Sequence, residues 1–186
     1  MRRVVVTGLG VVSSIGNNKG EVLRSLREGV SGIEFIPEMQ ELGFKCCVGG
    51  RVKHLDIGRV GKRARQTMSA AALYAAVAAL EAIEDAELPP EALRSPRGGV
   101  VVGSSFGGIN EVAKAEQLLS KYRNPSRLGG TGLVKVMHST ASGNLAAWLG
   151  VEGRAYSICS SFCSGVDNIG HAYELIARGA IDLCIA

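Results

Sequence analysis

The chain has 186 residues, of which 46% are hydrophobic and 20% charged, and its net charge is +4. The charged fraction and the many Val, Ile, Leu and Ala residues exclude an intrinsically disordered chain. A surplus of four positive charges is too small to indicate a nucleic-acid-binding protein, because the charge must be clustered to attract a polyanion. No window approaches about eighteen uninterrupted apolar residues, so we expect no membrane span. The composition, with 25 glycines, predicts an α/β domain rich in glycine turns.

The first half of the sequence contains two apolar runs separated by a stretch rich in turn residues. Arg-Val-Val-Val-Thr at 3–7 is typical of a strand buried on both faces, and Asn18 can cap a helix that Gly29 ends. An alanine-rich segment with leucines at helical spacing predicts the longest helix. The expected elements are a strand at 3–7, a helix at 18–27, an irregular stretch at 30–60 and a helix at 66–86.

The second half alternates strand and helix patterns more regularly. Short β-branched runs that end in glycine or small residues lead each time into an amphipathic segment. The expected elements are strands at 98–103, 156–159 and 182–186, helices at 110–121, 135–149 and 164–178, a loop at 122–132 and a tight turn at 160–163. This order predicts a mostly parallel sheet covered by helices on both faces.

The five cysteines are odd in number and include no Cys-x-x-Cys pair. Neither a disulfide framework nor a zinc site fits this spacing, so we expect no metal and a reducing, cytoplasmic location. The basic and apolar start is broken by Gly8 and Gly10 before any cleavage site, which argues against a signal peptide.

Thr7-Gly8-Leu9-Gly10 resembles the start of a dinucleotide-binding fingerprint. The third glycine of that motif would fall at position 13, where the chain has Ser13, and no acidic residue follows a second strand at the usual distance. A plain tight turn is the alternative to a nucleotide site.

The segment from Tyr156 to His171 passes from a strand through small residues directly into a helix. This is the geometry of a nucleophile elbow, which holds one side chain exposed at a helix N-terminus. A thiol in that position would have its thiolate favoured by the helix dipole, and the N–H groups of the first turn can stabilise an oxyanion. The alternative is an ordinary strand-to-helix turn with a buried cysteine.

Several motifs together resemble the elongating β-ketoacyl-acyl carrier protein synthases, over the whole length of the chain. The resemblance rests on Val4 to Gly10 with Ser13 and Gly16, on Gly103 to Gly108, on Lys135-Val136-Met137, and on Tyr156-Ser157-Ile158 with Asn168 to Ala172. It implies the thiolase-like αβαβα layered fold and a homodimer. It also implies decarboxylative condensation of malonyl carrier protein with an acyl chain held on a cysteine, in fatty-acid or polyketide biosynthesis. No resident cofactor is implied, because phosphopantetheine arrives on the acyl carrier protein.

The chain departs from the family pattern at the nucleophile. The family's cysteine lies eight residues before the glycine that aligns with Gly170, and that position is Phe162 here. The neighbouring Cys163 is displaced by one residue, about 100° around a helix. Three interpretations follow: a catalytically silent partner of the chain-length-factor kind, an active enzyme whose position 162 is substituted or wrongly read, or an enzyme in which Cys163 takes over.

The resemblance also implies two catalytic histidines, both in the second half of the family fold. The three histidines present, His54, His138 and His171, match no catalytic motif, and we expect each to be structural. The first falls in the irregular stretch and the other two fall in expected helices.

Two further features are assigned through the resemblance. Phe106 aligns with a position that lines the acyl pocket, the alternative being core packing. Lys62, Arg63 and Arg65 match residues that help dock the acidic carrier protein, for which electrostatic steering gives the physical reason. A solvated basic face is the alternative for this cluster.

The family fold is about twice as long as this chain. We therefore expect residues 1–186 to be the N-terminal β-ketoacyl synthase domain, with the C-terminal half of the fold absent. The expected partners are acyl carrier protein and either a second copy of the chain or a paralogous synthase.

Overall fold

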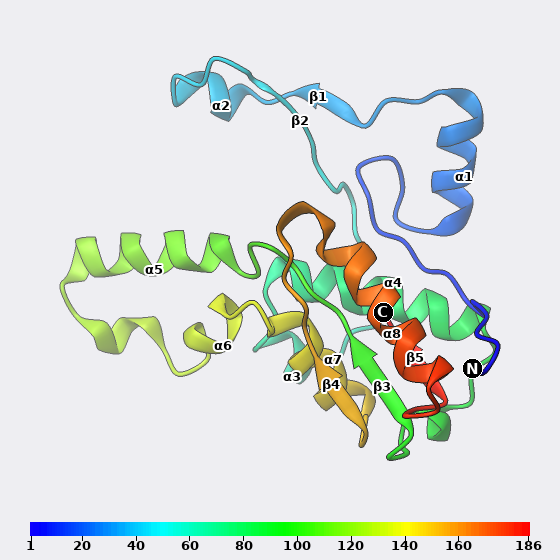
Figure 1. Cartoon of the computed structure of the whole chain (residues 1–186). Coiled ribbons are helices and arrows are strands. Elements are labelled where there is room, and N and C mark those ends of the chain that lie inside the picture. The colour runs from blue at the N-terminus through cyan, green and yellow to red at the C-terminus, as the bar shows by residue number, and fades with distance from the viewer. The chain divides into compact units, whose positions relative to one another are not determined.

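A computed structural model describes the backbone of residues 1–186 and every side chain except that of residue 90 (Figure 1). The chain divides into two compact units. Unit 1 comprises Met1–Val6, Gly58–Ala76 and Leu88–Ala186, and unit 2 comprises Thr7–Ile57 and Val77–Glu87. Among the described residues, no helix combines the length and the apolar character that a membrane crossing needs.

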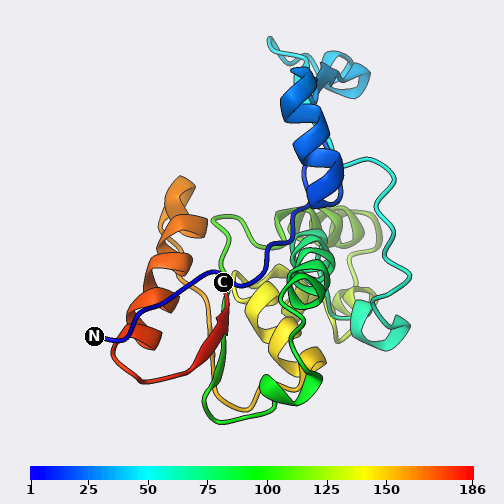
Figure 2. The same ribbon diagram turned by 90° about the vertical axis from the view of Figure 1, so that its right-hand side faces the viewer.

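Unit 1 is built on a three-stranded sheet in the order β4 (Arg154–Tyr156), β3 (Gly98–Val101) and β5 (Leu183–Ile185). Both pairings are parallel, with Val100 opposite Ala155 on one side and Ile185 on the other. Helix α8 (Ser164–Ala177) lies on one face of the sheet and α7 (Thr140–Leu149) on the other (Figure 2). The prediction of a parallel sheet covered on both faces is therefore confirmed.

The core of unit 1 explains why these runs are strands. All four residues of β3 are buried, and Val101 packs in one cluster with Leu175 of α8 and with Ile181. A strand covered on both faces cannot alternate polar and apolar side chains, which is why its sequence reads Gly-Gly-Val-Val. Leu145 of α7 is also fully buried.

The remaining helices of unit 1 include one close to the limits expected at 110–121 and several short ones that were not expected, one of them inside the loop expected at 122–132. They are α3 (Lys62–Arg65), η1 (Pro90–Ala92), α5 (Ile109–Tyr122), η2 (Pro125–Leu128) and α6 (Gly132–Val136), with η3 (Ser161–Cys163) before α8. The helix expected at 135–149 is interrupted, because Met137 has extended backbone with ψ 145°. The interruption lies where the Gly107–Gly108 backbone packs against the chain, since a Cβ on Gly107 would meet the Met137 carbonyl oxygen at 2.8 Å.

The helix expected at 66–86 is α4 (Ala70–Asp85), which contributes residues to both units. It begins four residues later than expected, after the separate short helix α3. The Ser69 hydroxyl accepts a hydrogen bond from the Ala72 backbone N–H at 3.3 Å, as a residue at a helix N-terminus does.

Unit 2 contains α1 (Lys19–Glu28), β1 (Ile33–Phe35), α2 (Pro37–Glu41) and β2 (Val48–Gly50). The Asn18 side chain caps α1 by accepting from the Glu21 N–H, and Gly29 ends it with φ 66°, as predicted. The stretch at 30–60 is less irregular than expected, because β1 and β2 pair antiparallel with Glu34 opposite Gly49. The two glycines there read as a turn in the sequence but belong to a strand.

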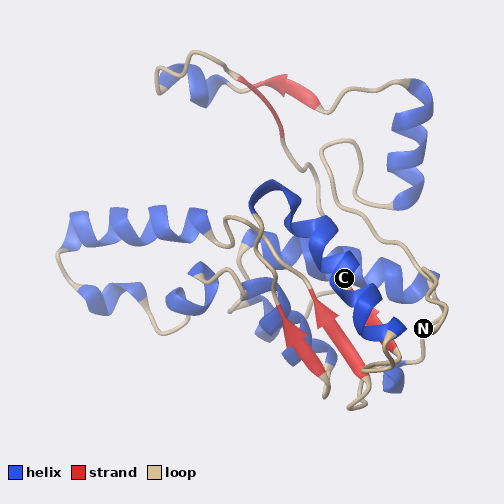
Figure 3. Ribbon diagram, viewed as in Figure 1, coloured by secondary structure: helices blue, strands red, loops and turns tan.

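The strand expected at 3–7 is wrong: the segment is drawn as loop (Figure 3). A strand exists through pairing with a neighbour, and no strand pairs with residues 3–7 in the described chain. Within unit 2, the N–H groups that follow are bound by side chains of α4 instead. The Leu9 N–H donates to Asp85 Oδ2 at 2.9 Å, and the Val11 N–H donates to Glu81 Oε2 at 3.0 Å.

Gly8 and Gly10, which suggested a dinucleotide fingerprint, have a packing role in unit 2. A Cβ on Gly8 would meet Ala86 N at 2.9 Å, and one on Gly10 would meet Ala82 N at 2.9 Å and overlap the Ala78 carbonyl. The glycines thus allow the backbone to lie directly against α4. The residues just before them form a loop, whereas a dinucleotide fingerprint follows a strand.

Candidate functional site

The strongest candidate site is the turn from β4 into α8, at residues 157–164. The chain leaves β4 at Tyr156, forms the 3-10 turn η3 and enters α8 at Ser164. Ser161 has a left-handed backbone with φ 59°, which non-glycine residues adopt rarely. Such a sharp turn between a strand and a helix is the elbow that the sequence predicted.

A buried asparagine ties the strand side of the elbow to α8. Asn168 is 1% exposed, and its Oδ1 accepts from the Ile158 N–H at 3.0 Å. Its Nδ2 donates to the Ile158 carbonyl at 2.9 Å and to the Ser164 carbonyl at 2.5 Å. Gly103, at the exit of β3, leaves the necessary room, because a Cβ there would lie 2.6 Å from Asn168 Nδ2.

Serine hydroxyls hold the tip of the elbow. The buried Ser164 hydroxyl accepts from the Ser160 N–H at 3.1 Å and donates to the Ser161 carbonyl at 2.6 Å. The Ser105 hydroxyl also donates to the Ser161 carbonyl. Serine hydroxyls therefore fix the backbone just before residue 162, and Asn168 fixes the Ser164 carbonyl after it. None of these bonds uses the side chain at 162.

Phe162 lies at the tip of this turn and is 95% exposed. An exposed tip is where an elbow presents its nucleophile, and a phenylalanine ring has no atom that can serve as one. Cys163 follows at the N-cap position of α8 and is also exposed. The structure thus places the two predicted residues, Phe162 and Cys163, next to each other in the same exposed turn.

The Gly103–Gly108 loop runs beside the elbow, as the bond from Ser105 to Ser161 shows. Phe106 in this loop is 64% exposed. The alternative interpretation, that Phe106 packs in the core, is therefore wrong within the described chain. Gly107 has φ 52°, which lets the loop turn back toward residues 137 and 138. The structure therefore brings two segments about 55 residues apart in sequence to one place.

The basic cluster lies on the short helix α3. Lys62 and Arg63 are exposed, whereas Arg65 is half-buried and its Nε is shielded from solvent without a hydrogen-bond partner among the described residues. The first two side chains are therefore open to a docking partner, and Arg65 is open only in part.

The histidines form no catalytic group with the elbow in the described part of the chain. His138 lies in the turn between α6 and α7, not on a helix as expected, and its Nδ1 is 3.3 Å from the Ser104 carbonyl oxygen. His171 lies on α8 as expected, bonded to the Tyr156 hydroxyl and packed edge-on against that ring. Both rings thus have neighbouring partners outside any catalytic pair, as we expect of structural histidines. His54 has a left-handed backbone with φ 52° in a loop of unit 2.

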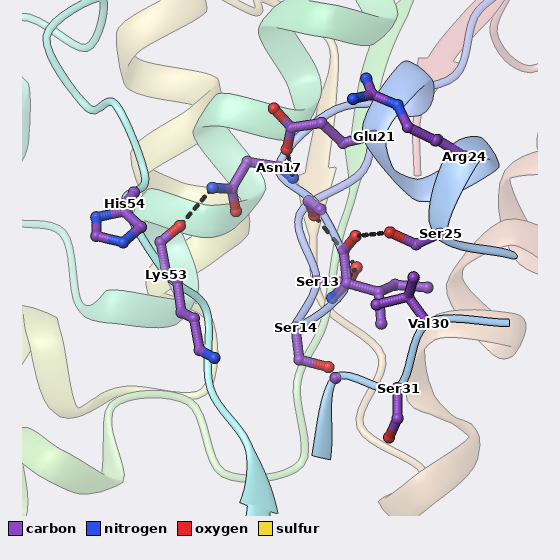
Figure 4. A pocket seen from close by; sticks show the side chains of 13 residues that line it. Ser13, Ser14, Asn17, Glu21, Arg24, Ser25, Val30, Ser31, Lys53 and His54 are labelled. Carbon is purple, nitrogen blue, oxygen red and sulfur yellow. Dashed lines mark hydrogen bonds between the residues drawn. The ribbon is translucent and has the colours of Figure 1, made fainter. Parts of the chain in front are cut away.

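A separate pocket of about 430 Å³ lies in unit 2 between the start of α1 and the segments around Ser31 and Lys53 (Figure 4). Asn17 Nδ2 donates to the Lys53 carbonyl at 2.5 Å across it. The Asn17 backbone N–H holds the pKa of the Glu21 carboxyl below its usual value. His54 lines the pocket, but Figure 4 shows no hydrogen bond from its ring to the serines drawn there. Among these described residues, the pocket therefore shows no nucleophile paired with a base.

No group of three or more His, Cys, Asp or Glu side chains comes together as a metal site among the described residues. All five cysteines are free thiols, three of them exposed. Burial raises the pKa of the Cys184 thiol, in β5, to about 11.

Sequence reasoning missed the residues that support the elbow: Ser105, Ser164 and Asn168. Two signals were available. Asn168 is a polar residue inside an apolar helix face, and Ser164 opens that helix. Which backbone groups they bind depends on the crossing of β3, β4 and α8, which no local pattern contains.

The whole chain is similar to known proteins in sequence and in fold. Residues 1–186 match the family model described as beta-ketoacyl synthase, N-terminal domain. Two curated relatives named 3-oxoacyl-[acyl-carrier-protein] synthase 1 are similar over the whole chain, with 38% identity in Haemophilus influenzae and 39% in Escherichia coli strain K12. The chain spans 46% of the length of each. A solved structure named the ishigamide ketosynthase/chain length factor has a TM-score of 0.87 at 26% identity, covering 98% of this chain and 46% of that one.

Proposed function

The chain belongs to the beta-ketoacyl synthase family, and we propose from this premise that it serves decarboxylative condensation of malonyl carrier protein with an acyl thioester, as a 3-oxoacyl-[acyl-carrier-protein] synthase. The observation that supports the proposal is the elbow, whose exposed tip is residue 162. Residues 1–186 are proposed to be the N-terminal domain of that enzyme, in fatty-acid or polyketide biosynthesis.

The chemistry assigns one role to the tip residue. A thiolate at position 162 would attack the thioester carbonyl, the carbon–sulfur bond to the carrier's phosphopantetheine would break, and the carrier thiol would leave. Malonyl carrier protein would then lose CO2, and the resulting carbanion would attack the acyl carbon and release the enzyme thiolate. The backbone N–H at 162 is proposed as one oxyanion donor. Phosphopantetheine on the carrier is the only cofactor this scheme requires.

Phe162 cannot perform the first step, so we propose that this chain as it stands forms no acyl-enzyme. Activity would return with Phe162→Cys in the polypeptide that carries this chain. The test measures formation of the 3-oxoacyl carrier thioester from malonyl carrier protein and an acyl carrier thioester, because CO2 release alone can also come from decarboxylation without condensation. Condensation by Phe162→Cys alone supports the proposal, and condensation by the unchanged protein contradicts it.

A catalytically silent partner subunit of the chain-length-factor kind is the second candidate, and the exposed ring of Phe162 favours it. In this role the protein would form a heterodimer with an active paralogue, whereas the first role fits a homodimer. Co-purification with an active synthase of the same family would support the silent partner. A fully active homodimer of the Phe162→Cys protein would reject it.

We propose that Lys62, Arg63 and Arg65 dock the acidic carrier protein and that Phe106 lines the acyl pocket. Opposite charges steer association and make it sensitive to salt. The double variant Lys62→Glu, Arg63→Glu should weaken carrier binding at least tenfold at low salt, as measured by titration calorimetry. The exposed Lys45 on unit 2 provides the control, since Lys45→Glu should leave the affinity unchanged.

The location is proposed to be the cytoplasm, where free thiols persist in a reducing environment. The free cysteines of the chain support this proposal.

A further inference from the structure

Asn168 holds the elbow in a way that goes beyond packing. We infer that Asn168 is a positioning residue, which fixes where the side chain and the backbone N–H of residue 162 lie. The inference rests on the proposed function, because residue 162 matters only as the position that meets an acyl thioester.

An asparagine at position 168 costs free energy unless its hydrogen bonds are made. Asn168 lies inside α8, where asparagine is an unfavourable residue, and it is almost completely buried. A buried amide costs free energy unless its polar atoms are paired. Here both side-chain polar atoms are used, and all three bonds go to the backbone at the two ends of the elbow.

The three bonds of Asn168 join the end of the strand to the start of the helix. Asn168 binds both the N–H and the carbonyl of Ile158, as a neighbouring strand would, although β4 has ended two residues earlier. Its third bond reaches the Ser164 carbonyl in the first turn of α8. Ile158 lies four residues before position 162 and Ser164 two residues after it. The Asn168 side chain thus fixes the distance between Ile158 and Ser164, which flank the tip of the elbow on its two sides.

The chain that follows the neighbouring strand β3 lies directly against Asn168 and Ile158. At Gly103 a side chain would collide with the Ile158 carbonyl and with Asn168 Nδ2. The backbone at Gly103, just after β3, is therefore in close contact with both Asn168 and Ile158. Asn168 is also 1% exposed, so its side chain has little room to shift while its bonds remain.

The consequence concerns a thiol at position 162. At the start of α8 its thiolate would be stabilised by the helix dipole and first-turn N–H groups, an effect that falls off within one turn. Losing the Asn168 bonds would let the tip move away from these groups. The pKa of the thiol should then rise.

The test uses the full chain carrying Phe162→Cys, with and without Asn168→Ala. Alkylation of the thiol introduced at position 162 by iodoacetamide is followed as a function of pH, and peptide mass spectrometry separates it from its neighbours Cys159 and Cys163. We expect Asn168→Ala to raise the midpoint of the position-162 profile by about one pH unit, about a tenfold loss of thiolate near neutral pH. Asn168→Ser retains only a hydroxyl, which can reach the Ser164 carbonyl but not both groups of Ile158. This variant should also raise the midpoint of the position-162 profile.

Leu175→Ala provides the matched control. Leu175 is buried on the same helix in the core cluster, and its loss should destabilise the fold without moving the midpoint at position 162. An unchanged midpoint in both folded Asn168 variants would overturn the inference, and so would an equal shift in Leu175→Ala. Alkylation needs no condensing activity, so a failure of the proposed function would appear separately, in the assay for the 3-oxoacyl product.

Discussion

The close approach between the exit of β3 and the elbow predicts a large effect of Gly103→Ala. The added Cβ would overlap the Ile158 carbonyl oxygen and lie 2.6 Å from Asn168 Nδ2, where the first neighbour is backbone that cannot rotate away. Forcing an extra carbon into a packed site costs about 1–3 kcal/mol. Displacing the two bonds between Asn168 and Ile158 adds about 1 kcal/mol each. The free energy of unfolding should therefore fall by about 3–5 kcal/mol.

Urea unfolding followed by circular dichroism measures this loss. With a slope of about 2 kcal/mol per molar urea, the midpoint should drop by about 1.5–2.5 M. Gly143→Ala is the matched control, because Gly143 lies exposed within α7 and an added Cβ meets no atom within 4 Å. That change should raise stability by about 0.5–1 kcal/mol. A Gly103→Ala protein that loses less than about 1 kcal/mol, the lower end of the overpacking cost alone, would refute the packing argument.

Two further predictions concern ionisation and reactivity in unit 1. Hydrogen bonds from Arg97 and Arg2 hold the pKa of Asp182 well below its usual value, so its contribution to stability is present above the unfolded-state pKa and is lost as pH falls toward the folded one. Asp182→Asn should therefore lower the Tm at pH 7 and flatten the loss of Tm on acidification, and an unchanged pH profile by calorimetry would contradict this. Because the Cys184 thiol is half-buried and burial raises its pKa to about 11, iodoacetamide at pH 8 should modify the exposed Cys159 at least about tenfold faster than Cys184. Equal alkylation rates of Cys159 and Cys184 in peptide maps would contradict this prediction.

The sequence predicted the elements whose pattern is local. The Gly-Gly-Val-Val run of β3, the small residues that lead into α8 and the Asn18 cap of α1 each carry their own signal, and the structure has all three. The parallel sheet was predicted from the alternation of strand and helix patterns along the chain. The predicted limits of an element were wrong where backbone distant in sequence packs against it. At Met137, beside the Gly107–Gly108 loop, the helix expected at 135–149 is interrupted.

The expected strand at 3–7 shows a different limit. Its β-branched residues suit a buried strand, but strand formation depends on a neighbour that a local pattern cannot supply. The elbow could be located from sequence because it is a strand, a run of small residues and a helix in succession. The side chains that hold it could not, because Gly103, Ser105 and Asn168 meet only after three elements have crossed.

The central claim is that residue 162 occupies the nucleophile position and that Phe162 leaves that position without a nucleophile. The most direct measurement incubates the unchanged chain and its Phe162→Cys variant with a radiolabelled acyl carrier thioester, and then maps the label by peptide. We predict no retained label on the unchanged chain and label at position 162 of the variant. Label on Cys163 of the unchanged chain, or a variant labelled only at Cys159 or Cys163, would contradict the account.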